Sequence, residues 1–402
     1  MNINLARKLD YYFGIPLCFL LSLLENLRKV IFRKKRKNNP QKIMFIELSE
    51  MGSAILAYSS IIKAREFFPS AELYFLIFKK NEESVYVLDV IPKGNVLTVR
   101  TDSILGFLAD LLRAIYSVRK KKIDTVIDME LFSRLTSIIS CLSGADIRVG
   151  FDRFTLEGLY RGNLYTHKVA YNAYMHISKN FIALVYALLA PEGELPMVKT
   201  SIVGLHTFVP EYTPSQADKD QIKRLLEKEN SHITGAGKIV ILNPGINEAL
   251  QIRRWPLEHY FSLAEKLLAR QNVFVIFIGI GKNNAIKDEA LGKLGDRAIN
   301  LLGRIDLRQL LALYSISNLL ISHDSGATNI ASLTEIPVIA LFGPETPVLY
   351  APLKENKKIF YLNFACSPCL NAYNHRDSSC KNNKCMQEIK VEEVFLEAEK
   401  HI

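Results

Sequence analysis

The stretch Leu320-Ile321-Ser322-His323-Asp324-Ser325-Gly326-Ala327-Thr328-Asn329, with the later run Ile336-Pro337-Val338-Ile339-Ala340-Leu341-Phe342-Gly343-Pro344, decides the fold. Residues 319–322 and 338–342 are short apolar runs, which are typical of buried strands. Asp324-Ser325-Gly326 is a turn sequence, and residues 327–333 then form an apolar segment of helical length. The pattern predicts a βαβ unit, and such units bind ligands at the carboxyl ends of their strands.

The turn after the first of these strands has two interpretations. Asp324 or Ser325 would cap the short helix with its side-chain oxygen. Alternatively, the amide groups of residues 325–328 would bind a phosphate, and Asp324 would accept hydrogen bonds from sugar hydroxyls. The residues by themselves leave both interpretations open.

The rest of the chain repeats the alternation of strand and helix. We predict further strands at 42–48, 73–78, 96–99, 125–128, 147–150, 239–242, 273–278 and 299–301. We predict helices at 54–67, 103–119, 132–142, 177–189, 214–229, 257–269, 285–294 and 307–315. This alternation predicts an α/β protein with two doubly wound, Rossmann-like domains, at 39–200 and 201–402.

Length and charge agree with two domains behind a basic arm. A chain of 402 residues is too long for one ordinary core. The net charge is +10, and residues 1–42, with ten Lys or Arg and two acids, carry +8 of it. The remaining chain is nearly neutral, which argues against a nucleic-acid partner.

Residues 1–38 form this arm. Tyr11–Leu24 is uncharged over fourteen residues, fewer than the roughly 20 that span a bilayer, and it lacks a small-residue cleavage site. Leucines continue at helical spacing to Ile31, and Arg33–Lys37 is basic. We expect a helix that lies in the inner leaflet with the basic cluster on anionic headgroups. The alternative is a core helix followed by a solvated basic linker.

Two further strand ends carry polar motifs. Residues 49–53, Ser-Glu-Met-Gly-Ser, follow the first strand, and Gly52 would let the backbone approach a ligand. Asn243-Pro244-Gly245 follows a strand of the second half and leads to Arg253-Arg254-Trp255-Pro256. Either arginine would bind a diphosphate through paired hydrogen bonds, although adjacent arginines also occur in solvated loops.

These motifs resemble those of glycosyltransferase family 9, the ADP-heptose:lipopolysaccharide heptosyltransferases. The likeness covers about residues 42–395. It implies a GT-B fold, in which the two Rossmann-like domains face each other across a cleft. The donor would bind the second domain and the acceptor the first. It also implies an inverting transfer that needs no metal or other cofactor for catalysis.

The resemblance assigns roles to individual residues. Asp324, Ser325, Gly326 and Ala327 match the donor-binding turn. Asn329 stands where the family often has His, and neighbouring His323 would either replace that charge or be an ordinary strand-end residue. Gly279 and Lys282 match the nucleoside-binding segment, where the family has an acid in place of Lys282.

The first loop departs from the family at the position of the catalytic base. The family's Asp is replaced by Ser53, whose hydroxyl is no general base near neutral pH without a partner. Glu50 is the nearest carboxylate and our predicted substitute, whereas Glu47 lies within the predicted strand. The resemblance therefore implies transfer of heptose, or another sugar, to a lipid-linked glycan at the cytoplasmic face of the bacterial inner membrane. The competing hypothesis is a non-catalytic member that binds a nucleotide sugar or glycan.

Four of the six cysteines lie close together near the carboxyl terminus. Cys366, Cys369, Cys380 and Cys385 have the spacing Cys-x2-Cys-x10-Cys-x4-Cys. Four thiolates at such spacing would hold a structural zinc ion, with no open position for catalysis. Free thiols and disulfides are the alternatives for the same four residues.

Overall fold

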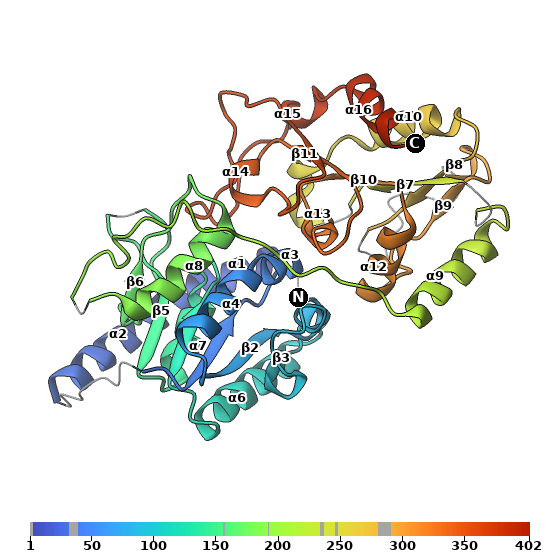
Figure 1. Ribbon diagram of the computed structural model, residues 1–402. Coiled ribbons are helices and arrows are strands. Elements are labelled where there is room, and N and C mark those ends of the chain that lie inside the picture. Colours follow the sequence, from blue (N-terminus) through green and yellow to red (C-terminus); the bar gives the residue numbers. More distant parts are fainter. Residues whose placement is uncertain are drawn as a thin grey trace. The chain divides into compact units, whose positions relative to one another are not determined.

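The computed structural model describes residues 3–31, 39–155, 157–191, 193–233, 237–245, 248–279 and 291–402. It divides into two compact units (Figure 1). The first unit comprises Met1–Phe208 with Asn371–Asp377, and the second comprises Val209–Leu370 with Ser378–Ile402. The division falls close to the predicted boundary at residue 200. That a segment of the cysteine-rich region belongs to the first unit was not predicted.

The first unit contains a parallel sheet of six strands in the order β3-β2-β1-β4-β5-β6. The strands are β1 (Lys42–Ile46), β2 (Glu72–Phe78), β3 (Val96–Val99), β4 (Thr125–Asp128), β5 (Ile147–Phe151) and β6 (His167–Val169). This is the doubly wound order of a Rossmann fold. The strand order reverses between β1 and β4, where Ile46 pairs in register with Asp128.

Helices cover both faces of this sheet. They are α3 (Met51–Leu56), α4 (Tyr58–Phe67), α5 (Glu83–Tyr86), α6 (Ile104–Lys120), α7 (Arg134–Leu142) and α8 (Ile177–Tyr186). Because strand side chains alternate between faces, Met44 and Ile46 pack with α6 and α7 on one face. The α4 and α8 helices contact each other.

The amino-terminal arm folds as two helices, α1 (Ile3–Tyr12) and α2 (Gly14–Ile31). Cys18 of α2 is fully buried and packs against α7. Glu25 of α2 pairs with buried Arg148 of β5 at 2.6 Å, and Asp10 of α1 pairs with Arg134 of α7 at 2.8 Å. The arm therefore packs on the first unit through one side of α2, while leucines on its other side are exposed. Its contact with a membrane stays a prediction. In the described part of the chain, no helix is long and apolar enough to cross a membrane.

The second unit contains another parallel six-stranded sheet, in the order β12-β11-β10-β7-β8-β9. Its strands are β7 (Lys238–Asn243), β8 (Val273–Phe277), β9 (Ala298–Asn300), β10 (Leu319–His323), β11 (Val338–Phe342) and β12 (Lys357–Tyr361). The order repeats that of the first sheet, with the reversal between β7 and β10. Both predicted Rossmann-like sheets are therefore confirmed.

The helices of the second unit are α9 (Gln216–Glu229), α10 (Leu257–Leu268), α12 (Leu307–Ile316), α13 (Gly326–Ala331), α14 (Pro347–Tyr350), α15 (Lys384–Gln387) and α16 (Val391–Ala398), with a 3-10 turn at Glu248–Arg253. Local sequence sets their ends. Asp306 and Gln309 form a capping box at the start of α12, in which each side chain accepts a hydrogen bond from the other's backbone amide.

Some predicted elements differ in extent from those in the structure. The predicted helix 54–67 begins earlier, at Met51, and is divided at Ala57 into α3 and α4. Strands β6 and β12 were missed, because β6 has only three residues and β12 begins with the exposed pair Lys357-Lys358. The predicted helix 285–294 lies mostly outside the described residues.

Candidate active site

Three glutamates follow the two strands at the centre of the first sheet. Glu47 comes directly after β1, Glu50 precedes α3, and Glu130 lies two residues beyond β4. Glu130 accepts hydrogen bonds from the backbone amides of Leu48 and Ser49, both at 2.9 Å. This interaction joins the loop after β1 to the end of β4. The sequence analysis did not select Glu130 as a site residue. Its position just beyond the end of a predicted strand could have indicated it, because polar residues there often face a ligand.

Glu50 and Ser53, the two predicted catalytic residues, contact each other. The Ser53 hydroxyl donates to Glu50 Oε2 at 3.1 Å. Gly52 and Ser53 lie in the first turn of α3, and not in a loop as predicted, because the helix begins at Met51. Residues 50 and 53 are therefore one helical turn apart, which brings their side chains together.

Arg376 is the cationic partner of Glu50. Its guanidinium forms an ion pair with Glu50 Oε1, and its backbone carbonyl accepts a hydrogen bond from Arg7 at 3.0 Å. In the same segment, the Tyr373 hydroxyl donates to the Tyr171 carbonyl at 3.0 Å. Segment 371–377 thus places a positive charge at the predicted base. Its sequence, Asn-Ala-Tyr-Asn-His-Arg-Asp, carried no signal for this role.

Burial changes the proton affinity of the neighbouring acids. Burial, followed by the charges of Glu130 and Glu50, raises the pKa of Glu47 well above its usual range, while Arg376 opposes the shift. Burial also raises the pKa of Glu130, although the hydrogen bonds from Ser49 and Leu48 act to lower it. Glu47, which was predicted to lie within the strand, is a buried carboxyl just beyond it.

In the second unit, the predicted donor residues meet where the strand order reverses. Arg253 donates to Asp324 Oδ2 at 2.9 Å, from the segment after β7 to the end of β10. Both side chains are mostly buried, at 16% and 6% exposed, so this charge-assisted pair is shielded from solvent. Arg253 is therefore not part of a solvated loop, which was the alternative interpretation.

Asn243 at the end of β7 joins the same network. Its Nδ2 donates to the hydroxyls of Ser322 and Ser325, each at 3.0 Å. Gly279 follows β8, and a Cβ built there would lie 3.7 Å from Asn243 Oδ1 and 2.8 Å from a Leu302 methyl group. Gly279 thus lies beside this network, and its predicted role in binding the nucleoside stays a prediction. Lys282 lies outside the described residues.

The His323 side chain is buried and neutral. Burial, together with the charges of Arg253 and Arg254, lowers its pKa to about 3. The Tyr260 hydroxyl on α10 forms a hydrogen bond with the Nδ1 atom of His323, with 3.2 Å between the two atoms. A Cβ at Gly245, whose φ is +52°, would lie 2.5 Å from the imidazole. His323 therefore does not supply the positive charge that Asn329 lacks. It is a packed strand-end residue.

The turn at 324–327 fits a phosphate less well than its sequence indicated. The α13 helix that follows has only six residues, so its dipole is small, and the Thr328 amide already donates to the Ser325 carbonyl. Ser325 occupies the N-cap position without capping through its side chain, and Gly326 and Ala327 form the first turn. Within the described residues, the buried Oδ1 of Asn329 has no hydrogen-bond partner. This oxygen is suited to accept a hydrogen bond from a ligand hydroxyl.

Residues 252–255 are hydrogen-bonded to residues 383–389 of the carboxyl-terminal tail. Trp255 is fully buried, and its Nε1 donates to the Ile389 carbonyl at 3.0 Å. Asn383 Nδ2 donates to the carbonyls of Ile252 and Arg254 at 2.9 and 2.8 Å. These bonds fix the backbone on both sides of Arg253. Sequence reasoning found the Trp-Pro motif but missed its partners in the tail.

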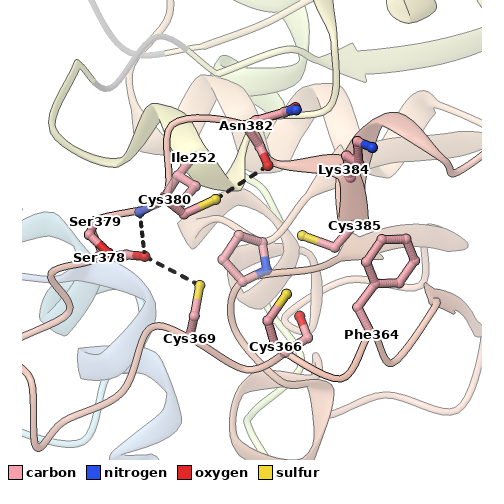
Figure 2. Close-up of a pocket in the computed structure, with 12 residues that line it drawn as sticks. Ile252, Phe364, Cys366, Cys369, Ser378, Ser379, Cys380, Asn382, Lys384 and Cys385 are labelled. Atoms are coloured by element: carbon pink, nitrogen blue, oxygen red, sulfur yellow. Dashed lines mark hydrogen bonds between the residues drawn. The ribbon is translucent and has the colours of Figure 1, made fainter.

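The four clustered cysteines line one cavity of about 360 Å³ (Figure 2). Cys385 is buried, and burial raises the pKa of its thiol. The Ser378 hydroxyl lies 3.5 Å from Cys369 Sγ, and the Cys380 thiol donates to the Asn382 carbonyl at 3.3 Å. None of the four forms a disulfide bond, and in the part of the chain described no three His, Cys, Asp or Glu are grouped closely enough to hold a metal. The zinc site therefore stays a prediction.

Comparison of the sequence with models of protein families identifies the family of this chain. Residues 111–379, well over half of the chain, match the model described as "Glycosyltransferase family 9 (heptosyltransferase)". The chain belongs to glycosyltransferase family 9. Solved structures agree on a GT-B-like fold. The structure of E. coli ADP-heptose lps heptosyltransferase II aligns with a TM-score of 0.67, at 18% identity over 90% of this chain and 98% of that one.

Two of the individual relatives are between 23% and 28% identical to this chain over the matched residues. Lipooligosaccharide heptosyltransferase 2 of Campylobacter jejuni serotype O:6 is 28% identical over 44% of this chain and 55% of its own length. Lipopolysaccharide core heptosyltransferase OpsX of Haemophilus influenzae is 23% identical over 78% of this chain and 82% of its own length. The match thus spans about half the length of the Campylobacter relative.

The raised pKa of Glu47 predicts a pH-dependent stability. The folded protein retains a proton that the unfolded chain releases, so the free energy of unfolding falls as pH rises above glutamate's ordinary pKa of 4.5. Glu47→Gln removes this contribution. Urea unfolding between pH 4.5 and 8 should give a flatter profile for the variant, by about 1 kcal/mol or more over the range. Exposed Glu66→Gln is the control, and equal slopes for Glu47→Gln and wild type would contradict the assignment.

Zinc binding by the four thiols is tested by metal analysis of protein purified without chelators. The prediction is about one zinc per chain, lost in Cys369→Ser and kept in Cys141→Ser, since Cys141 lies outside the cluster. Titration with a thiol reagent should then show the four thiols protected until a chelator is added. Metal-free protein with reactive thiols would refute zinc binding.

Proposed function

We propose that this protein is an inverting glycosyltransferase that moves a heptose from ADP-heptose to a lipid-linked glycan, such as a lipopolysaccharide core. The observation that carries the proposal is the Arg253–Asp324 pair where β7 and β10 diverge, in a chain of family 9. Ligands of doubly wound sheets bind at this point of strand reversal.

The donor is the more specific half of the proposal. Two supports are the names of relatives, which are heptosyltransferases of lipopolysaccharide or lipooligosaccharide, and a structure of E. coli WaaC with ADP-2-deoxy-2-fluoro heptose. In this chain, Arg253 would bind the diphosphate, and Arg254 would add a second positive charge. One carboxylate oxygen of Asp324 would accept a hydrogen bond from Arg253, and the other would accept one from a sugar hydroxyl. Asn329 Oδ1 would accept a hydrogen bond from a second hydroxyl.

The chemistry is a single in-line displacement. The acceptor hydroxyl attacks the anomeric carbon, the bond from that carbon to the diphosphate oxygen breaks, and the configuration inverts. The acceptor proton passes to the Glu50 carboxylate, which Ser53 and Arg376 orient. The arginines of the second unit stabilise the negative charge that develops on the leaving diphosphate.

The acceptor and location follow from the same proposal. A lipid-linked glycan requires work at a membrane surface, and the basic arm favours the anionic cytoplasmic face of the bacterial inner membrane. The alternative function is a non-catalytic member that binds a nucleotide sugar or glycan. Ser53, in place of the family's Asp, is the observation that favours it.

The proposed function predicts that the protein binds ADP. Calorimetry with ADP, UDP, GDP and CMP should give selective binding of ADP. Arg253→Ala and Asp324→Ala should each weaken it by about ten- to hundredfold, because each removes a charged hydrogen-bonding group from a buried site. Arg304→Ala, at a surface ion pair with Glu229, is the matched control. Preference for another nucleotide would discard ADP-heptose, and binding of none would favour the non-catalytic alternative.

Glu50→Gln tests the base. The turnover number should fall by about 10²- to 10⁴-fold while ADP affinity is retained, since general-base catalysis contributes this much. Ser53→Ala should lose much less, because it only orients Glu50. Glu66→Gln controls for the loss of an exposed carboxylate. Undiminished turnover by Glu50→Gln would move the role to another group, and Glu47→Gln would be assayed next.

A further inference from the structure

Helix α6 is apolar on both of its sides. Its inner residues, including Ala114 and Val118, are buried against the first sheet. Its outer side carries five large apolar residues that are 47% to 82% exposed: Ile104, Leu105, Leu108, Leu112 and Tyr116. A surface helix of a globular protein ordinarily has polar residues on that side. An exposed apolar stripe of this length indicates a surface that contacts something apolar.

Helix α2 carries a second stripe in the same layer. Leu20, Leu23, Leu24 and Leu27 are 46% to 60% exposed, although Cys18 on the other side is fully buried against α7. Helix α7 also packs into the core shared with α6, and Arg119 of α6 donates to the Leu142 carbonyl at the end of α7 at 2.8 Å. The α6 and α2 helices therefore flank α7 on one face of the sheet (Figure 1).

The two helices run in the same direction and both end in positive charge. The start of α2 contacts Arg134 at the beginning of α7, and Glu25 near its end pairs with Arg148 at the beginning of β5. It therefore runs toward the amino edge of the sheet, as does α6, which leads into β4. The α6 helix ends in the basic run 119–122, and α2 is followed in the sequence by the basic run 33–37.

The α6 helix has one acid in its sequence, and that acid is neutralised. Asp110 is buried and pairs with Arg100 and Arg113, each at 2.7 Å. Lys121 lies 5.2 Å from the Tyr74 ring, while Arg119, Lys120 and Lys122 are exposed. An apolar stripe bordered by exposed basic side chains matches the boundary of an anionic bilayer, where acyl chains meet negative headgroups. It does not match a second copy of the same surface as well, because the basic ends of two copies add like charge to the contact.

We propose that the outer sides of α6 and α2 together form a docking surface for an anionic lipid bilayer. The inference rests on the proposed function, which requires a membrane-bound acceptor, and it assigns that contact to the body of the first unit as well as to its arm. Laying this face of the sheet on the bilayer places its carboxyl edge, with Glu50, at the rim of the contact. A lipid-linked glycan would reach Glu50 from there.

Vesicle flotation tests the surface with the full chain. The probes are vesicles of phosphatidylglycerol and phosphatidylethanolamine, and vesicles of phosphatidylcholine alone. Wild type should bind the anionic vesicles and bind phosphatidylcholine weakly. The variant Leu105→Gln/Leu108→Gln/Leu112→Gln should partition at least about tenfold less, because three apolar side chains lose their burial in lipid. Leu20→Gln/Leu24→Gln should have a similar effect.

Matched variants separate the contributions. Leu396→Gln on α16 of the second unit, at 62% exposed, removes an exposed leucine elsewhere and should bind like wild type. Arg119→Ser/Lys120→Ser/Lys122→Ser should lose binding to anionic vesicles while leaving the weak phosphatidylcholine binding unchanged, and wild-type binding should weaken with salt. Thermal melts confirm that each variant remains folded.

Two results would overturn the proposal. One is wild-type binding by the α6 triple-leucine variant. The other is light scattering that shows a dimer which this variant dissociates, while vesicle binding stays unchanged. Transfer to a water-soluble acceptor fragment separates this inference from the proposed function, since the α6 variants should keep that activity and lose only activity on vesicle-bound acceptor. If wild type is inactive on both acceptors but the α6 variants still lose vesicle binding, the docking surface is upheld and the transferase function is rejected.

Discussion

The pairing of β1 with β4 and of β7 with β10 is the constraint on which the rest of the structure depends. In each sheet the chain crosses over to the opposite side at this pair. The segments after the two paired strands therefore lead to opposite sides of the sheet, while their first residues lie next to each other. Glu47 and Glu130 follow one pair, and Asn243 and Asp324 follow the other. Residues far apart in the sequence meet because the strands that precede them are hydrogen-bonded in register.

The two pairs gather opposite kinds of charge. The first has a surplus of carboxylates, which is suited to accept a proton, and burial raises the pKa of Glu47 and Glu130. The second has adjacent arginines, with one carboxylate to orient Arg253, and is suited to a leaving diphosphate. A displacement needs both a proton acceptor and a stabilised leaving group. The charges gathered in each sheet, taken separately, therefore support the proposed transfer reaction.

The sequence was sufficient for the local parts of the fold, and it singled out residues that the structure brings together. Apolar runs of strand length and turn sequences predicted nearly every strand, and the Trp-Pro and Asp-Ser-Gly motifs predicted Arg253 and Asp324. Interactions between distant residues could not be predicted. Arg376 pairs with Glu50 from 326 positions away, and Asn383 supports Arg254 from 129 positions away. Such contacts depend on how segments pack, for which single-residue patterns carry no signal. The neutral state of His323 likewise follows from burial, which its sequence neighbours do not reveal.

The contact between Glu50 and Ser53 follows from the geometry of one helical turn. Glu50 is the N-cap residue of α3 and Ser53 lies one turn later, so their side chains meet at 3.1 Å. An aspartate at position 53 would place a second carboxylate against Glu50. Like charges at such a distance cannot both remain ionised, and one of them would lose its use as a base. A serine avoids this repulsion and donates a hydrogen bond that orients the remaining carboxylate. The geometry therefore supports Glu50 as the proposed base, with the Ser53 hydroxyl and the Arg376 guanidinium as its hydrogen-bonding and charged partners.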